Sequence, residues 1–274
     1  RTGKELWRYR TAEPPANGVG VWSTVSVDLP ARTVFATTGN NYTESAGPTS
    51  DSVIALDLRT GQVRWIRQVS AGDVFTVPNS RSQDSDFGTN PVLFEADVNG
   101  SRRKLLGAGQ KSGLFSVLDR DTGEIVWQRQ VSDGSALIGG VFNNGAYDGR
   151  SLIMVGNNGP PGPGADPLDR PRTHTVGTAL LTALDPATGD VRWQTELPSW
   201  VWAPVTLADR VAFVGVDREL RVFDSRSGKQ LFSMETEGTI SSAPAVVGRR
   251  VYFGSGVSYL PPTKSGRTVY ALEG

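Results

Sequence analysis

The sequence predicts an all-β fold made of repeated four-stranded units, and three observations lead to this prediction. A pattern with an Asp, a Gly four residues later and a large ring four residues after the Gly recurs along the chain. The intervals between its copies suit units of about four short strands joined by variable loops. Pro and Gly interrupt the sequence too often for a convincing amphipathic helix. Units of this size are typical of the blades of a β-propeller.

The repeated pattern is a β-hairpin whose turn chemistry can be read directly. Residues 55–65 read Ala-Leu-Asp-Leu-Arg-Thr-Gly-Gln-Val-Arg-Trp, and the pattern returns at 117–127 and 183–193. A weaker copy at 222–232 has Ser in place of Thr and Phe in place of Trp. Each copy has a short apolar strand, a turn whose Gly can take positive φ, and a second strand that ends in a ring. The turn glycines are Gly3, Gly61, Gly123, Gly189 and Gly228.

Further strands are predicted between the hairpins, where β-branched and aromatic residues alternate. These strands lie at residues 23–27, 33–37, 104–108, 152–155, 211–215 and 251–254. The long connections are residues 41–52, 72–90, 157–175 and 257–267. Long loops on a rigid all-β frame are where function usually resides.

Composition excludes several classes of function. Lys and Arg number 28 and so do Asp and Glu, so no basic surface indicates nucleic-acid binding. The chain has no Cys, which excludes a thiolate nucleophile, a Cys-ligated zinc and a covalent c-type haem within it. Its one histidine, His174, is predicted to be an ordinary loop residue and cannot build a His-based metal cluster. No apolar run is long enough for a membrane span.

The two ends of the sequence carry halves of the repeat. Residues 1–7 read as the second half of the hairpin, and residues 268–274 read as a first half. Two alternatives follow: the chain is cut from a longer protein, or residues 269–272 pair with residues 4–8 and close a ring. In either case residues 1–274 form a single propeller region, with about four complete blades and partial first and last blades.

The repeated Asp-x-x-Thr-Gly-x-x-x-Trp motif resembles the tryptophan-docking repeat of the quinoprotein alcohol dehydrogenases. In that family the repeat builds an eight-bladed propeller around pyrroloquinoline quinone (PQQ). Scaffold propellers of the outer-membrane assembly type carry similar repeats, so the motif leaves two functions open. One is an enzyme, and the other is a non-catalytic scaffold for protein–protein interaction. The stretches between the motifs distinguish them.

The first such stretch contains Trp22 and, eighteen residues later, Asn40. It resembles the family segment in which a Trp forms the floor beneath the quinone and an Asn gives its side-chain oxygen to the metal. A flat ring suits a tricyclic cofactor, and a hard divalent cation needs oxygen ligands. The alternative is a strand Trp packed in the core and an Asn in a left-handed turn.

The second stretch, residues 84–94, resembles the loop that supplies the family's catalytic aspartate. Asp86 matches that position, which implies the roles of general base toward the substrate hydroxyl and of neighbour or ligand of the metal. Lanthanide-dependent relatives carry another acid two residues further on. Gly88 stands at that position here, which favours calcium. The alternative is an Asp that caps a surface turn.

The third stretch, residues 104–119, has a basic residue before Ser-Gly. Lys111 resembles the family position where Arg or Lys reaches the quinone oxygens and stabilises the charge of the reduced cofactor. The alternative is a solvated lysine on a hairpin. The sequences Gly-Asn-Asn-Tyr, Asp-Phe-Gly and Gly-Gln-Lys-Ser-Gly are most similar to the polyvinyl-alcohol-dehydrogenase-like branch of the family.

The resemblance implies PQQ- and calcium-dependent oxidation of a small or polymeric alcohol, either a secondary alcohol or a polyol. It also implies a separate cytochrome c-like electron acceptor and a periplasmic or extracellular location. Relatives have a further metal-ligating Glu and other cofactor contacts upstream of the first residue of this sequence. Two protein ligands alone would hold calcium weakly, so PQQ and calcium binding is in question for the isolated chain. An enzyme requires Trp22, Asn40, Asp86 and Lys111 to converge on one site, whereas a scaffold does not.

Overall fold

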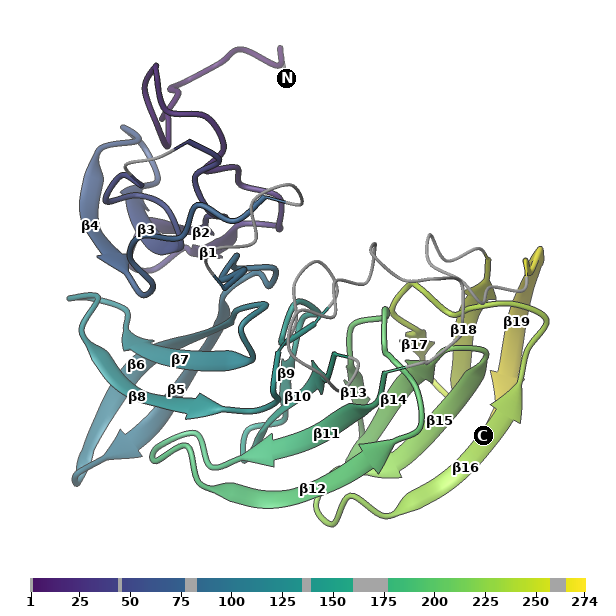
Figure 1. Cartoon of the computed structure of the whole chain (residues 1–274). Helices are drawn as coiled ribbons and strands as arrows, with labels where there is room; N and C mark the ends of the chain where they lie inside the picture. The colour runs from purple at the N-terminus through teal and green to yellow at the C-terminus, as the bar shows by residue number, and fades with distance from the viewer. Residues whose placement is uncertain (1, 44–45, 77–82, 135–138, 160–176, 257–264) are drawn as a thin grey trace.

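The computed structural model contains only strands and their connections in the part of the chain that it describes. Five antiparallel sheets follow one another along an open arc (Figure 1). His174 and parts of the long connections at 157–175 and 257–267 lie outside the described residues. The structure describes residues 2–43, 46–76, 83–134, 139–159, 177–256 and 265–274.

Each sheet takes its strands consecutively from the sequence, as the repeats predict. The first two sheets contain β1 (Ser26–Asp28), β2 (Thr33–Thr37), β3 (Ser52–Asp57) and β4 (Val63–Gln68), then β5 (Val92–Val98), β6 (Ser101–Gly109), β7 (Leu114–Asp119) and β8 (Ile125–Gln130). The third contains β9 (Ala146–Tyr147), β10 (Leu152–Asn157), β11 (Ala179–Leu184) and β12 (Val191–Leu197). The fourth contains β13 (Thr206–Ala208), β14 (Val211–Val216), β15 (Glu219–Asp224) and β16 (Gln230–Glu235), and the fifth contains β17 (Ala245–Val247), β18 (Arg250–Ser255) and β19 (Thr268–Glu273).

The predicted strands between the hairpins are all present, and β2 has the predicted bounds. The strand predicted at 23–27 is shorter, because β1 begins only at Ser26. The Ser26 hydroxyl donates to the carbonyl of Pro91, and Ser23 is hydrogen-bonded to the Thr37 hydroxyl at 2.7 Å. Side-chain contacts therefore fix the residues just before β1, and Trp22 stands on a loop rather than in a strand.

Apolar side chains from neighbouring sheets interleave to form the core. Phe35 and Val53 of the first sheet pack with Leu106 and Leu118 of the second in one buried cluster. Equivalent clusters join the second sheet to the third and the third to the fourth. Burial of this apolar surface is the main stabilising contribution.

The Asp of each repeat holds the hairpin turn in place. The Asp57 carboxylate accepts the backbone N–H groups of Arg59 and Thr60 at 2.9 and 3.0 Å. The N–H of Gly61 donates to the carbonyl of Asp57 at 2.9 Å, and Gly61 has φ of 69°. Asp119, Asp185 and Asp224 make the same contacts in the other hairpins.

The tryptophan of each repeat binds the turn of the next sheet. The indole N–H of Trp65 donates to the carbonyl of Arg120 at 3.0 Å, and its ring covers Gly123. A Cβ atom at Gly123 would lie 2.6 Å from Trp65 Cε3, so only glycine allows this approach. The same indole contact joins Trp7 to Leu58, Trp127 to Pro186 and Trp193 to Ser225.

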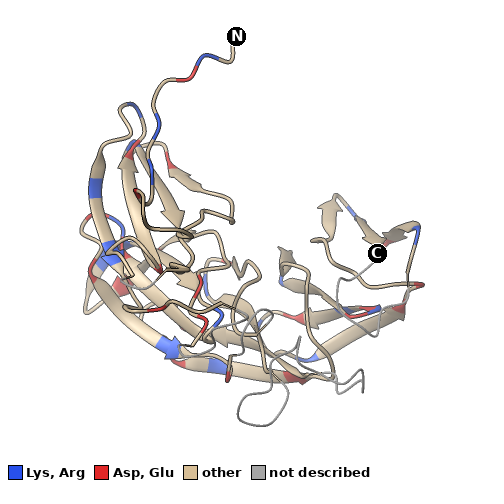
Figure 2. Cartoon of the chain, turned by 45° about the horizontal axis from the view of Figure 1, so that its top comes forward, with Lys and Arg blue, Asp and Glu red and all other residues tan. Residues whose placement is uncertain are grey.

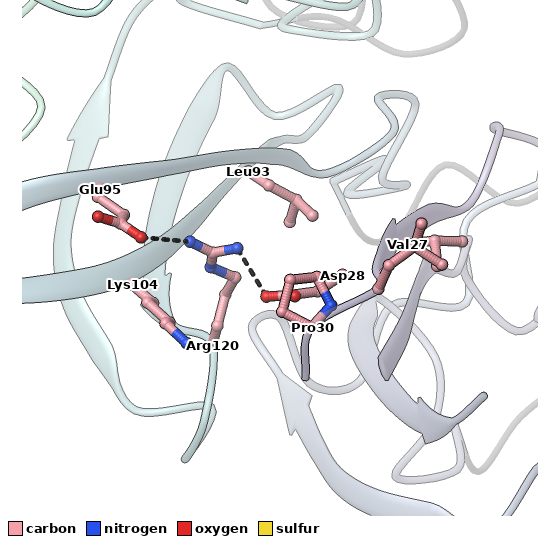
Figure 3. A pocket seen from close by; sticks show the side chains of 8 residues that line it. Val27, Asp28, Pro30, Leu93, Glu95, Lys104 and Arg120 are labelled. Carbon is pink, nitrogen blue, oxygen red and sulfur yellow. Dashed lines mark hydrogen bonds and ion pairs between the residues drawn. The ribbon is translucent and has the colours of Figure 1, made fainter. Parts of the chain in front are cut away.

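A buried ion pair adds a second link between the first two sheets (Figure 3). Arg120, in the turn after β7, donates to the Asp28 carboxylate at the end of β1 over 2.8 Å and to the Phe94 carbonyl over 3.0 Å. Both side chains are buried, so removal of one partner would leave an uncompensated charge. Asp28 therefore joins two sheets at the end of β1 opposite to Trp22.

The five sheets do not close into a ring (Figures 1 and 2). In the described residues β19 pairs with β18, and residues 4–8 form no strand. Trp7 instead contacts the first hairpin turn through Leu58. Of the two alternatives for the chain ends, closure of a ring by residues 269–272 and 4–8 is not found in the described residues, and the sheets form an open arc.

Charged residues of both signs are interspersed along the arc (Figure 2). This mixture agrees with the zero formal net charge of the sequence. The described residues include no helix with the length and apolar character that a bilayer crossing requires.

One acid in the connection between β2 and β3 is buried without a hydrogen-bond partner. Asp51 is 0% exposed, and neither of its carboxylate oxygens accepts a hydrogen bond. Its backbone N–H donates to the Gly39 carbonyl, which fixes the end of β2. Burial, followed by the charges of Asp73, Asp86 and Asp84, raises the pKa of Asp51 to about 9. The neighbouring Ser50 side chain offsets this rise in the pKa of Asp51 only in part.

The docking contact predicts that Gly123→Ala destabilises the protein more than an equally strained control. Gly123 and Gly100 both have positive φ, 72° and 79°, but an added Cβ at Gly100 has no atom within 4 Å. Left-handed backbone costs about 1–2 kcal/mol for Ala at either position, and overpacking against Trp65 should add about 1–3 kcal/mol at Gly123. Urea unfolding of the two variants measures the difference. Equal losses of stability would contradict the docking role.

The burial of Asp51 predicts a pH-dependent cost that Asp51→Asn removes. Between about pH 4 and pH 9 the carboxyl is protonated in the folded chain and ionised in the unfolded chain, so its contribution to stability falls as the pH rises. Asn keeps the size and tolerates the φ of 48°. The free energy of unfolding is measured in urea at pH 5 and at pH 8. Between these two pH values, the stability of Asp51→Asn relative to the wild type should increase by more than about 1 kcal/mol. Parallel curves of stability against pH for the two proteins would contradict a raised pKa for Asp51. Asp97→Asn serves as the control, because Asp97 is exposed.

Candidate functional site

Three loops meet beside the ends of β2 and β6. The N–H of Phe87 donates to the Thr38 carbonyl at 3.3 Å, and Phe87 bridges to Gln110 as an antiparallel pair. The N–H of Lys111 donates to the Asp86 carbonyl at 3.0 Å. Backbone bonds therefore hold residues 84–87 between the loop after β2 and the turn before β7.

Asn40 and Asp86 are in direct contact. The backbone N–H of Asn40 donates to Asp86 Oδ1 at 2.6 Å, and both residues are buried. The Asn40 side-chain amide donates to the Phe75 carbonyl at 2.7 Å, which turns its oxygen away from that carbonyl. A Cβ at Gly39 would lie 2.5 Å from Asp86 Oδ1, so the glycine makes room for the carboxylate.

Lys111 lies between two carboxylates. Its Nζ atom is 2.6 Å from Asp86 Oδ2 and 3.2 Å from Asp84 Oδ2, and its side chain is 11% exposed. Burial by itself lowers the pKa of Lys111, but the charges and hydrogen bonds of Asp84 and Asp86 outweigh it and the net shift is upward. Lys111 is therefore a buried cation rather than a solvated hairpin lysine.

Trp22 presents a half-exposed ring next to this cluster. The Lys111 Nζ atom lies 5.3 Å from the ring centroid, within the range of a cation–π contact, and Trp22 is 49% exposed. A Cβ at Gly88 would lie 2.8 Å from Trp22 Cη2 and 2.5 Å from Phe142 Cβ. Gly88 thus leaves the space that the indole edge occupies, and Trp22 is not a core tryptophan.

The structure brings all four predicted side chains into one neighbourhood. Three more acids of this neighbourhood were missed by the sequence reasoning: Asp51, Asp73 and Asp84. The position of Asp84 could have been predicted from its spacing to Asp86. Residues two apart in an extended segment lie on the same side, so Asp84 should face the same site as Asp86. Asp73 and Asp51 come from separate loops, and the sequence carries no sign that these loops meet.

The residues fit a planar anionic cofactor, and they fit a hard cation only in part. A half-exposed indole and a buried ammonium group suit an aromatic anion. Asn40 and Asp86 offer amide and carboxylate oxygens, the ligands that calcium prefers. In the described residues no group of three or more His, Cys, Asp or Glu side chains is placed to hold a metal ion. Further ligands would have to come from outside these residues.

A pocket of about 470 Å³ lies away from this neighbourhood, between β1 and the second sheet (Figure 3). Its wall combines the Asp28–Arg120 ion pair with apolar side chains, and none of the four predicted residues lines it. The lining residues are Val27, Asp28, Leu29, Pro30, Leu93, Glu95, Lys104 and Arg120. The pocket is a feature of the contact between sheets and not of the candidate site.

Two family profiles together match almost the whole chain. The profile described as the β-propeller domain of glucose, ethanol and alcohol dehydrogenases matches residues 1–135. The profile described as the outer membrane protein assembly factor BamB matches residues 110–272. All four predicted site residues lie in the part that the dehydrogenase profile matches.

Two proteins that are similar over the whole of this chain are polyvinylalcohol dehydrogenases. The chain is 29% identical to polyvinylalcohol dehydrogenase of Sphingopyxis sp. (strain 113P3), covering 100% of this chain and 46% of that protein. It is 30% identical to polyvinylalcohol dehydrogenase of Pseudomonas sp., covering 100% of this chain and 42% of that protein. The chain therefore spans less than half the length of these relatives.

A solved structure shows the same fold. Quinohemoprotein alcohol dehydrogenase from Comamonas testosteroni superimposes with a TM-score of 0.72 at 20% sequence identity, over 93% of this chain and 48% of that one. The tryptophan-docking hairpins, the matching profiles and the similarity of the whole of this chain to part of the polyvinylalcohol dehydrogenases agree. The chain belongs to the quinoprotein family of β-propellers, in the branch that resembles PQQ-dependent alcohol dehydrogenases.

Proposed function

We propose that this chain forms the substrate-oxidising part of a PQQ- and calcium-dependent alcohol dehydrogenase. The observation that carries the proposal is the convergence of Trp22, Asn40, Asp86 and Lys111. Packing of separate loops alone gives no reason for a flat ring, two residues with side-chain oxygens and a buried cation to lie together.

Each residue has a role that follows from its surroundings. Trp22 offers its exposed ring for stacking, and Lys111 holds a cation beside it for the cofactor oxygens. Asp86 would take the proton from the substrate hydroxyl, and Asn40 keeps that carboxylate oriented through its backbone N–H. When bound, PQQ supplies the quinone that accepts the hydride from the alcohol carbon.

Gly88 supports calcium rather than a lanthanide as the metal. The space that a side chain at this position would need is filled by the Trp22 ring and by the Cα and Cβ atoms of Phe142. A second acid could enter only if the Trp22 ring and the backbone at Phe142 moved. Asn40 and Asp86 therefore supply the oxygens of the proposed metal site, with further ligands from outside these residues.

The substrate is proposed to be a secondary alcohol or a polyol, either small or polymeric. The polyvinylalcohol dehydrogenases, similar over the full length of this chain, support this choice. A cytochrome c-like acceptor and a periplasmic or extracellular location rest on the resemblance of the repeats alone.

The second candidate is a non-catalytic scaffold, and a specific observation favours it. The BamB profile matches the larger part of the chain, residues 110–272. That part includes Lys111 but none of the other three site residues. The scaffold proposal predicts that the chain binds neither PQQ nor calcium at the candidate site.

The dehydrogenase proposal is tested by adding PQQ and Ca²⁺ to the chain and following dye reduction with secondary, primary and polymeric alcohols. We expect activity with secondary alcohols and a loss of about 100-fold or more in kcat for Asp86→Asn, because a positioned base typically contributes that much. Asp97→Asn is the matched control, since Asp97 is exposed on β5. Quenching of tryptophan fluorescence measures PQQ binding independently of turnover.

Two results would contradict the dehydrogenase proposal. One is a folded wild-type chain that fails to bind PQQ even at calcium concentrations high enough to fill a weak site, which would favour the scaffold. The other is an Asp86→Asn variant that keeps the wild-type rate, which would remove Asp86 from the reaction.

A further inference from the structure

Asp84 is the second carboxylate on Lys111, and the backbone around it is firmly held. The N–H of Ser85 donates to an Asp73 oxygen at 2.6 Å, and the Gln110 side-chain amide donates to the Ser85 carbonyl at 2.7 Å. Asp84 itself has a side chain that is only 2% exposed. These bonds fix the backbone next to Asp84, and its Oδ2 atom lies 3.2 Å from Lys111 Nζ.

In the proposed reaction, Asp86 would have to contact the cation and the substrate hydroxyl in addition to its present partners, Asn40 and Lys111. Its Oδ1 atom accepts the Asn40 N–H, and its Oδ2 atom binds the Lys111 ammonium group at 2.6 Å. A divalent cation on the same carboxylate would repel that ammonium group. If Asp86 were the sole partner of Lys111, binding of the cation would leave a buried charge uncompensated, which is costly.

We propose that Asp84 is a positioning residue that keeps the Lys111 ammonium group beside Trp22 while Asp86 is engaged by the cation and the substrate. This inference rests on the proposed function. Lys111 can release Asp86 and remain paired, because Asp84 Oδ2 already lies 3.2 Å from its Nζ atom. Asp86 is then free for its own role, and the cation that faces the cofactor stays in place.

The first test measures how well Lys111 is protected, without PQQ or metal. An amine-acylating reagent is applied to the wild type, Asp84→Asn, Asp86→Asn and the double variant, and labelling of Lys111 is followed by peptide mass spectrometry. We expect Asp86→Asn to label within a few-fold of the wild type, because Asp84 still holds the ammonium group. The double variant should label about tenfold faster or more, in line with the loss of a charged hydrogen bond. Lys104, which is exposed, serves as the internal reference.

Equal labelling of Asp86→Asn and the double variant would overturn the inference, because Asp84 would then hold nothing. If the double variant does not fold by circular dichroism, Asp84→Asn is labelled with and without Ca²⁺ instead. We expect Ca²⁺ to expose Lys111 in Asp84→Asn and to leave the wild type protected. Exposure to the same degree in both would overturn the inference.

The second test separates positioning from simple charge. Asp84→Asn removes a negative charge, which by itself should strengthen binding of an anionic quinone. The inference predicts the opposite, a PQQ affinity about tenfold weaker with Ca²⁺ present, because Lys111 is no longer held. Asp97→Asn should bind as the wild type does. Equal or tighter binding by Asp84→Asn would overturn the inference. A wild type that does not bind PQQ would instead refute the proposed function, and the labelling test would still decide whether Asp84 holds Lys111.

Discussion

The contact of each tryptophan with the glycine turn of the next sheet is the interaction on which the arrangement of the sheets depends. The indole N–H of Trp65 binds the carbonyl of Arg120, and its ring fills the space that a side chain at Gly123 would occupy. Repetition of this contact from Trp7 to Trp193 sets the first four sheets side by side. The loops after β2 and β6 meet only because the first two sheets are held in this way, with the Asp28–Arg120 pair as a second link.

The candidate site uses that rigid frame to concentrate negative charge. Asp51, Asp73, Asp84 and Asp86 are all buried, and Lys111 is the cation paired with two of them. Burial makes negative charge costly, and a proton on Asp51 lowers the total negative charge of the cluster. The proposed calcium ion would offset more of this charge.

The sequence predicts the hairpins well because their chemistry is local. The Asp, Gly and Trp of each repeat act through residues a few positions away and through one contact with the next copy. The spacing of Trp22 and Asn40 indicates a functional site only because it resembles a segment of a known family. Burial of Asp84 and Asp51 could not be predicted, because it arises when residues 83–87 pack against the ends of β2 and β6. The late start of the strand predicted at 23–27 depends on partners that are distant in the sequence, Pro91 and Thr37.

The most direct measurement of the central claim is a crystal structure of the chain with PQQ and calcium. We predict that the quinone stacks on Trp22 and that an ion lies about 2.3–2.6 Å from oxygens of Asn40 and Asp86. We also predict that Lys111 stays within hydrogen-bonding distance of Asp84. A structure that retains the five sheets but places PQQ elsewhere, or shows the ion bound away from Asp86, would contradict the account.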